Sequence, residues 1–393
     1  MTAENSTARP ISERGLPGPL KIPQMDTLRV LAMLGIFSHH LGMAVIQDPQ
    51  TMLERVVHSI VYVGKDGVIF FNIISGFLLA YPYLGPAQQS LPNYRTFLRK
   101  RFLRIIPAYY IALLVFSAAN VVVFNFPAES SLRYMLEHAI FVNSFDYQTL
   151  NLNTAAFWYM GMLAQFYLVF PFVLRIFRRV GPTRGALSLI ALSWGACFLA
   201  SRHFSANPDS LLGTASGMMY FNLPVRLPEF AIGMWLAAIW NPAASSSRES
   251  RLSRPFRLLI AGMVLYVLIC ALFPVNVDDF SSYLLHASVA VPLFALLFLW
   301  SPMSQVAGFS VVRKLSKHSF DIYLVHQPIL SYFGVMSGNV PGSITELLKL
   351  SLVFFPLSYL AATVLDWAAG MVPGFFQRKS SEADRTLNRD RFR

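Results

Sequence analysis

The feature that most restricts the fold of this chain is a series of about ten apolar runs, most of them close to the roughly 20 residues that cross a bilayer as an α-helix. Composition agrees, because 55% of the 393 residues are hydrophobic and only 13% are charged, against about 25% charged in soluble domains. The sequence therefore excludes a soluble globular enzyme, a fibre and a disordered chain. The runs lie near 27–46, 67–84, 102–124, 155–177, 185–201, 227–241, 255–274, 282–301, 318–336 and 347–371.

The placement of basic residues predicts how these helices are oriented. Lys and Arg accumulate in the cytoplasmic loops of membrane proteins. With the N-terminus inside, most of the 32 Lys and Arg residues fall in loops on the cytoplasmic side. We therefore expect an all-α membrane protein, a polytopic bundle of about ten transmembrane helices with both termini cytoplasmic. The net charge of +12 then reflects topology and contact with anionic lipid, and it requires no nucleic-acid partner.

The chain divides into one membrane domain and two polar tails. Residues 1–24 hold four prolines and no apolar core, so we expect a cytoplasmic tail without a cleavable signal peptide, and the first helix directs insertion. Residues 25–371 form the membrane domain, and residues 372–393 form a charged cytoplasmic tail that is too short to bury a core. Cys197 and Cys270 each lie in an apolar run, which indicates neither a disulfide framework nor a metal set.

The first apolar run carries ionisable residues that a bilayer disfavours by about 2.5–3.5 kcal/mol each. Arg29 and His40 are eleven residues apart, which places both on one face of a helix and about 16 Å apart along its axis. We expect Arg29 near the cytoplasmic mouth and His40 deep in the membrane. There, an imidazole close to neutrality is suited to accept a proton from a hydroxyl nucleophile. A histidine that is hydrogen-bonded within the bundle fits the helix equally well, and His39 points about 100° away.

A second set of charges begins the third run. Arg101 and Arg104 are three residues apart and share a helix face. Such a pair can bind one anion through both guanidinium groups, and it suits phosphates. Taken alone, the pattern is explained better by the general excess of arginine in cytoplasmic loops. No zinc-type spacing, phosphate-binding glycine loop or Gly-x-Ser-x-Gly elbow occurs, so we expect no metal site.

The order of the polar segments is more specific than any one of them. Asp26-x-Leu28-Arg29, with ten residues between Arg29 and His40, comes first. The segments that follow are Gly67-Val68…Ser75-Gly76-Phe77, Arg101-x-x-Arg104…Pro107, Trp158…Gln165-Phe166-Tyr167, Arg226-x-Pro228-Glu229-Phe230-x-x-Gly233 and Ser319-x-x-Ile322-Tyr323-Leu324-x-His326-x-Pro328. From about residue 25 to 371, the chain resembles the acyltransferase-3 family of integral-membrane acyltransferases.

This resemblance implies a multi-pass protein of the plasma or inner membrane that binds no cofactor. It would transfer an acyl group, commonly acetyl, from cytoplasmic acyl-CoA to a hydroxyl of a glycan, a cell-envelope polymer or a lipophilic metabolite. His40 would then be the catalytic histidine with Arg29 as its motif partner, and Arg101 and Arg104 would contact the CoA phosphates. Supporting positions would be Asp26, Ser75, Arg226, Glu229 and His326. A covalent acyl intermediate stays open as an alternative, because no serine or cysteine stands out as a nucleophile.

The chain departs from the family pattern in its carboxylates. Ile69 stands where the family often has an acid, and Leu163 and Ala164 stand where it often has a glutamate. Asp26, Asp66 or Glu229 could take over that role. We also expect no hydrolase-like module of the kind some members carry after the membrane domain, so this chain would complete transfer itself or pass the acyl group to a separate protein.

Two other functional classes remain open at this point. A transporter or flippase for an amphipathic or lipid-linked solute would also carry charges inside the membrane, although we find no internal repeat of the kind many transporters have. A non-catalytic relative that binds acyl-CoA or a partner is the other class, and the missing carboxylates keep it open. Consumption of acyl-CoA in step with product formation would separate the enzyme from both.

Overall fold

The computed structural model describes residues 22–145, 155–206, 221–240, 280–300, 302–337 and 342–390. Within these ranges the protein is helical, and no strand occurs. The longer helices are α1 (Pro23–Val45), α3 (Gly67–Leu84), α4 (Tyr94–Phe124), α7 (Trp158–Val180), α8 (Pro182–Ala206), α10 (Leu223–Ile239), α12 (Phe280–Leu299), α14 (Ser310–Tyr332) and α15 (Ile344–Asp390). The shorter elements are α2 (Met52–Val63), η2 (Gly64–Asp66), α5 (Ala128–Ala139), η3 (Asn143–Phe145), η4 (Ala155–Phe157), α13 (Pro302–Val306) and η7 (Val335–Ser337).

The predicted apolar runs can be compared with these helices one by one. Each run that falls within the described residues coincides with a helix, whereas the run near 255–274 lies outside them. Six helical segments in the described part of the chain are long and apolar enough to cross a membrane. These segments are Pro23–Val45, Met52–Leu84, Tyr94–Phe124, Trp158–Val180, Pro182–Ala200 and Ile344–Val372. The chain therefore has the character of a multi-pass membrane protein, while the expected count of about ten and the cytoplasmic position of the termini stay predictions.

Local sequence determines where several helices begin. Thr51 and Glu54 form a capping box at the start of α2, since each side chain accepts a hydrogen bond from the other residue's backbone N–H. Asn93 caps α4 by accepting a hydrogen bond from the backbone N–H of Thr96 at 3.1 Å. Asn125 ends α4 in the left-handed conformation, with a φ of 54°, which asparagine tolerates better than most residues.

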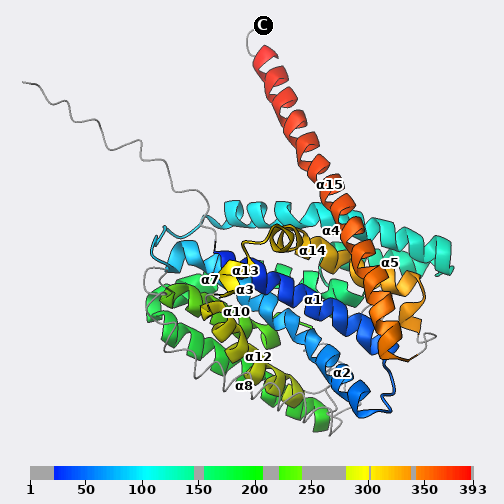
Figure 1. Ribbon diagram of the computed structural model, residues 1–393. Coiled ribbons are helices and arrows are strands. Elements are labelled where there is room, and N and C mark those ends of the chain that lie inside the picture. The colour runs from blue at the N-terminus through cyan, green and yellow to red at the C-terminus, as the bar shows by residue number, and fades with distance from the viewer. Residues whose placement is uncertain are drawn as a thin grey trace, which may run out of the picture.

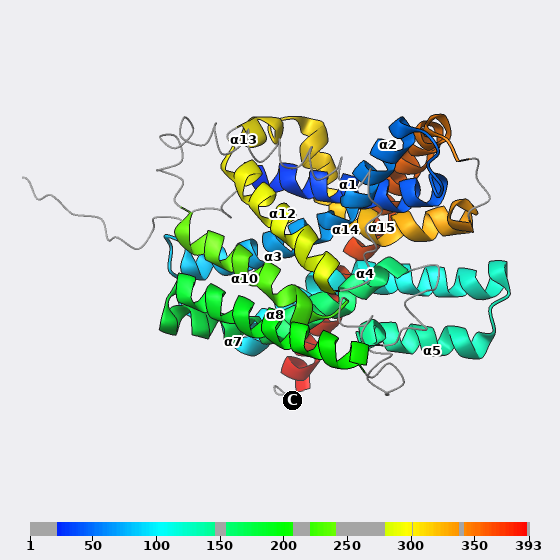
Figure 2. The ribbon, with the colours of Figure 1, turned by 90° about the horizontal axis from the view of Figure 1, so that it is seen from below.

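The centre of the bundle is a row of closely packed helices. α3 packs along α10, α1 packs against α14, and α14 packs against α15. Gly76 and Gly233 allow the close approach of α3 and α10, because a Cβ atom at either position would overlap the backbone carbonyl of the facing helix. Figure 1 shows α15 extending well beyond the other helices at its C-terminal end. Figure 2 shows α4 and α5 side by side at one end of the bundle, with α7, α8 and α10 grouped together elsewhere.

Candidate active site

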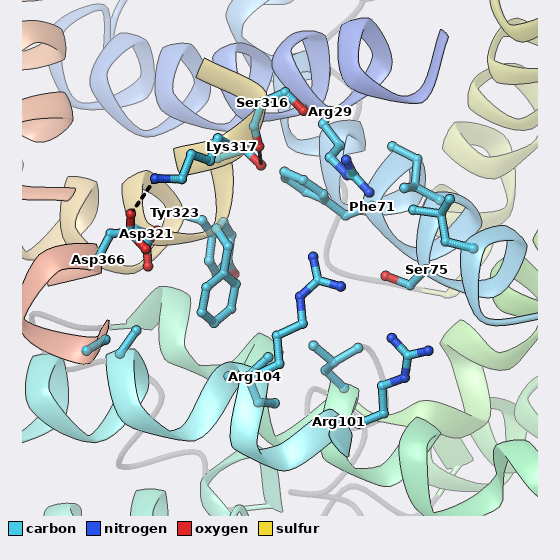
Figure 3. Close-up of a pocket in the computed structure, with 18 of the residues that line it drawn as sticks. Arg29, Phe71, Ser75, Arg101, Arg104, Ser316, Lys317, Asp321, Tyr323 and Asp366 are labelled. Carbon is cyan, nitrogen blue, oxygen red and sulfur yellow. Dashed lines mark hydrogen bonds and ion pairs between the residues drawn. The ribbon is translucent and has the colours of Figure 1, made fainter. Parts of the chain in front are cut away.

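A cavity of about 570 Å³ lies among α1, α3, α4, α7, α14 and α15. Its charged lining consists of four arginines and one lysine against three aspartates, so the cavity favours an anionic ligand. Figure 3 shows arginine side chains from opposite walls directed into the same space. The charged lining residues are Asp26, Arg29, Arg101, Arg104, Arg313, Lys317, Asp321 and Asp366.

Arg29 reaches the cavity from α1 and is oriented by Asp26, one helical turn earlier. The Arg29 Nη1 atom donates to Asp26 Oδ1 at 3.0 Å, and the same oxygen accepts a hydrogen bond from Ser316 Oγ at 2.7 Å. Asp26 therefore links Arg29 to α14 and fixes the direction of its guanidinium group. Both members of this pair remain accessible to a ligand, with 24% and 35% of the Arg29 and Asp26 side chains exposed.

Arg101 and Arg104 reach the cavity from α4, on the wall opposite Arg29 (Figure 3). Arg101 lies over the ring of Phe97, with 5.7 Å between the guanidinium carbon and the ring centroid, which holds its alkyl stem against the helix. The expected shared face is confirmed, since both residues line the same cavity. The guanidinium groups of three arginines around one space form a geometry suited to a polyphosphate.

Aromatic residues form part of the cavity lining. Tyr159 and Tyr323 lie with their ring centroids 5.3 Å apart, and Phe71 lies 6.3 Å from Tyr323. Tyr323 is fixed in place because its hydroxyl donates to the carbonyl oxygen of Ala156 at 2.7 Å. Ser75 also lines the cavity and is hydrogen-bonded to Tyr159.

His40 contacts His326, and this pair lies outside the cavity lining, next to Tyr323. The His40 Nδ1 and His326 Nε2 atoms are 2.9 Å apart, which joins α1 to α14. Neither histidine lines the cavity, but Tyr323 does, and its ring centroid lies 5.7 Å from that of His326. The structure therefore brings Arg29, Ser75, Arg101 and Arg104 together in one cavity and places His40 and His326 next to it.

The backbone determines which nitrogen atoms of the pair carry hydrogen. His326 Nδ1 lies 2.8 Å from the carbonyl oxygen of Tyr323 and 3.1 Å from that of Ile322. A carbonyl oxygen only accepts, so His326 Nδ1 is the protonated nitrogen and Nε2 of the neutral ring holds a lone pair. His40 Nδ1 must then donate to His326 Nε2. The free lone pair of the couple consequently lies on His40 Nε2.

Arg226 and Glu229 form a separate, fully buried network at the start of α10. The Arg226 Nη1 atom donates to Glu229 Oε1 at 2.9 Å, and side-chain exposures are 1% and 0%. The other carboxylate oxygen accepts a hydrogen bond from Asn72 at 2.5 Å, and the Tyr283 hydroxyl donates to Oε1 at 2.7 Å. These contacts join α3, α10 and α12, and neither charged residue lines the cavity.

The sequence of this chain matches a known protein family. A family described as an acyltransferase domain, acyltransferase-3, matches residues 22–367, which is most of the chain. The chain belongs to the acyltransferase-3 family. The resemblance based on the ordered sequence segments is thereby confirmed.

Staphylococcal relatives of this family member carry O-acetyltransferase names. The O-acetyltransferase OatA of Staphylococcus aureus strain NCTC 8325 / PS 47 is 25% identical over 354 residues, covering 82% of this chain and 53% of the relative. A protein of strain COL, whose name assigns O-acetyltransferase activity only provisionally, is 22% identical over 390 residues and covers 91% and 60%. The chain thus spans about half the length of the curated relatives it matches. No solved structure shows significant similarity to it.

Asp26, Asp66 and Glu229 are the candidates to replace the acids that this acyltransferase-3 chain lacks. Each of them has a partner other than His40. Asp26 bonds Arg29, and Glu229 bonds Arg226. Asp66 Oδ2 lies 2.9 Å from His286 Nδ1, and both residues are buried. The histidine that contacts His40 is His326 instead. His40 is therefore oriented by an imidazole rather than by any of the three carboxylates.

Several residues of this acyltransferase-3 site were not predicted. Ser316, Phe71 and Tyr159 line the cavity, but nothing in the sequence marks them as site residues. Tyr323 also lines it, and the sequence singles it out only as part of the last family segment. The spacing of Tyr323 and His326, three residues apart on one helix face, is a signal that could have linked the cavity to the histidine pair.

Proposed function

We propose that this chain transfers an acyl group, acetyl first among them, from acyl-CoA on the cytoplasmic side of the plasma membrane to a hydroxyl acceptor. The observation that carries the proposal is the hydrogen bond from His40 to His326, which leaves a lone pair on His40 Nε2. A base of this kind suits removal of a proton from a hydroxyl nucleophile. The O-acetyltransferase names of the relatives support both the acetyl group and the hydroxyl acceptor.

The positive cavity is the proposed donor site. Arg101 and Arg104 would bind the phosphates of acyl-CoA, and Arg29, held by Asp26, would contact them from the other wall. Each charge-assisted hydrogen bond from a guanidinium to a phosphate oxygen contributes about 1.5–3 kcal/mol. Because the donor is cytoplasmic, this assignment agrees with the predicted orientation, in which α4 begins at the cytoplasmic side.

The chemical step balances with His40 as a proton carrier. The acceptor hydroxyl gives its proton to His40 Nε2 while its oxygen attacks the thioester carbonyl carbon. The carbon–sulfur bond then breaks, and the departing CoA thiolate takes the proton from His40. His326 would stabilise the transient imidazolium by accepting the Nδ1 hydrogen of His40 throughout.

To reach His40, the acyl group of acyl-CoA must pass the aromatic residues that line the cavity. Phe71, Tyr159 and Tyr323 line the cavity, whereas His40 and His326 do not. Arg29 and His40 are also separated by about 16 Å along α1. A long, thin pantetheine arm suits that passage, and the aromatic side chains would turn aside as it enters. Their return would exclude water, which otherwise hydrolyses the thioester.

An assay in inside-out membrane vesicles tests the proposed activity. Vesicles that contain the protein receive acetyl-labelled acetyl-CoA together with extracts of envelope polysaccharide and lipid as acceptors. We expect release of free CoA in equal amount to the label transferred to acceptor, and neither in vesicles from cells without the protein. Label that enters the vesicles without CoA release would indicate a transporter and would contradict the proposal.

A further inference from the structure

Three potential metal ligands meet where α14 packs against α15. His318 and Asp321 are one helical turn apart on α14, and Asp366 reaches them from α15. The nitrogen of His318 and one carboxylate oxygen from each aspartate all lie within 4.8 Å of one another. The His318 Nδ1 atom is 4.0 Å from Asp321 Oδ2 and 3.7 Å from Asp366 Oδ2. Figure 3 shows Asp321 and Asp366 adjacent at one end of the cavity.

The histidine nitrogen in this cluster lacks a hydrogen-bond partner. His318 and Asp321 are 8% and 7% exposed. His318 Nδ1 is itself buried and bonds to no residue that the structure describes. A buried polar atom left in this way costs about 1–3 kcal/mol, and such atoms often mark the place of an ion. The nitrogen lies within 4.0 Å of an oxygen of each carboxylate, so a cation bound among the three groups would satisfy it.

We propose that His318, Asp321 and Asp366 bind a divalent cation of the Mn²⁺ or Zn²⁺ class. One imidazole nitrogen and two carboxylate oxygens are suitable ligands for these ions, whereas Mg²⁺ and Ca²⁺ prefer oxygen alone. Ligands at about 2.1 Å from one ion lie roughly 3 to 3.5 Å apart, so the three side chains would close by about 1 Å. Asp366 can move in this way, since 41% of its side chain is exposed.

Lys317 competes for one of the proposed ligands. Its ammonium nitrogen lies 2.8 Å from Asp366 Oδ2, the same oxygen that faces His318. The Lys317 side chain is 67% exposed, and an exposed ion pair of this kind contributes only about 0.2–1 kcal/mol. Binding of a divalent cation would displace the ammonium group into solvent. Removal of Lys317 should therefore tighten metal binding.

The position of the cluster links the proposed ion to the cavity. Asp321 and Asp366 line the cavity, and His318 is the member of the cluster that does not. A bound cation would neutralise two of the three acids in that lining. It would also join α14, which carries His326, to α15.

Mn²⁺ binding by the purified full-length protein tests the proposal directly. The protein is prepared in detergent without a polyhistidine tag, treated with EDTA and titrated with Mn²⁺ while free Mn²⁺ is measured by electron paramagnetic resonance. We expect about one bound ion per chain in the wild type. His318→Ala and Asp321→Asn should each weaken binding at least tenfold, and Lys317→Ala should strengthen it severalfold. His58→Ala, a histidine on α2 outside the cluster, should bind as the wild type does.

Three results would overturn the proposal. The first is no stoichiometric binding in the wild type. The second is binding that His318→Ala and Asp321→Asn leave unchanged, which would place the ion elsewhere. The third is binding that occurs only in Lys317→Ala, since the natural chain would then hold a lysine ion pair in place of a metal. None of these readouts depends on acyltransferase activity, so the metal site and the proposed function can fail separately.

Discussion

His326 is held in one tautomer by the backbone of its own helix. Its Nδ1–H faces the carbonyl oxygens of Ile322 and Tyr323, and its Nε2 lone pair accepts from His40. Under the proposed function, His326 would be a positioning residue, because it would act on the reaction through His40. An acceptor atom at the place of Nε2 is what this role requires.

Substitution of His326 by glutamine or by asparagine distinguishes the need for an acceptor atom at this place from the need for a side chain that fills the space. The amide of glutamine reaches the place of Nε2, whereas the shorter asparagine places its amide near Nδ1. We expect His326→Gln to keep a substantial part of kcat, because its oxygen can accept from His40 Nδ1. His326→Asn should lower kcat by about 10²- to 10⁴-fold, the range for loss of a correctly oriented base. The measurement is initial rates over a range of acetyl-CoA concentrations.

The KM for acetyl-CoA serves as the internal control in that comparison. It should stay close to the wild-type value in both variants, since His326 does not line the donor cavity. Equal kcat values for His326→Gln and His326→Asn would show that the tautomer of His40 does not depend on His326.

Arg101 and Arg104 should act on donor binding. We expect Arg101→Ala and Arg104→Ala each to raise the KM for acetyl-CoA by about tenfold or more, because each removes a charge-assisted hydrogen bond to phosphate. Raised ionic strength should weaken donor binding in the wild type as well. Arg99→Ala provides the matched control, since Arg99 is an exposed arginine on the same helix that does not line the cavity. If Arg99→Ala raised the KM for acetyl-CoA as much, Arg101 and Arg104 would contribute only to the general positive charge of the surface.

The sequence predicts part of this site at the residue scale and misses the rest for a physical reason. Helix geometry relates Arg29 to His40, and Arg101 to Arg104, because both members of each pair lie on one helix. The contact of His40 with His326 joins residues 286 positions apart, and no local periodicity reports it. His326 is visible in the sequence as an ionisable residue of an apolar run and as a family position, but nothing there pairs it with His40.

At the scale of elements, the crossing of α3 and α10 depends on two glycines. A Cβ atom at Gly76 would overlap the carbonyl oxygen of Phe230, and one at Gly233 would overlap that of Ile73. Close helix packing of this kind is common in membrane bundles. The Ser-Gly step at Ser75-Gly76 therefore explains how the two helices approach.

Alanine substitutions test this crossing. We expect Gly76→Ala and Gly233→Ala to destabilise the protein by about 1–3 kcal/mol, because backbone must shift to admit the methyl group. Thermal unfolding in detergent, followed by circular dichroism, measures the change. Gly195→Ala on α8 is the control, since a Cβ atom there meets nothing within 4 Å. Unchanged melting temperatures in all three variants would mean that α3 and α10 do not cross so closely.

Hydropathy predicts the long helices and misses short ones such as α2 and α5. α2 and α5 are 12 residues each, below the length that a search for spanning segments detects. α5 also carries charged residues among its apolar ones, such as Arg133 and Glu137, which pair at 2.8 Å. α5 packs against α4, and local hydropathy does not report such a tertiary contact.

At the scale of the whole molecule, orientation rests on charge asymmetry. The loop after α1 should face outward, and the loop after α3 should face the cytoplasm. Asp48 and Ala87 are exposed residues of these two loops. The described residues hold six helices long and apolar enough to cross a membrane, against about ten expected. Some predicted spans are too short to be counted, and α10, for example, has only 17 residues.

Cysteine labelling tests this orientation. In a background of Cys197→Ser and Cys270→Ser, Asp48→Cys should react with a membrane-impermeant maleimide in intact cells. Ala87→Cys should react only after the membrane is permeabilised. The reverse pattern would invert the bundle and place the positive cavity away from cytoplasmic acyl-CoA.

His40 is the proposed base for acyl transfer, and His39 beside it provides a matched comparison. His39 lies next in the chain and its Nδ1 faces the carbonyl oxygen of Val61 at 3.2 Å. Release of CoA from acetyl-CoA is measured in inside-out vesicles with wild type, His40→Ala and His39→Ala at matched expression. We expect a loss of about 10²-fold or more for His40→Ala and a much smaller change for His39→Ala. Wild-type turnover in His40→Ala would contradict the proposed role of His40.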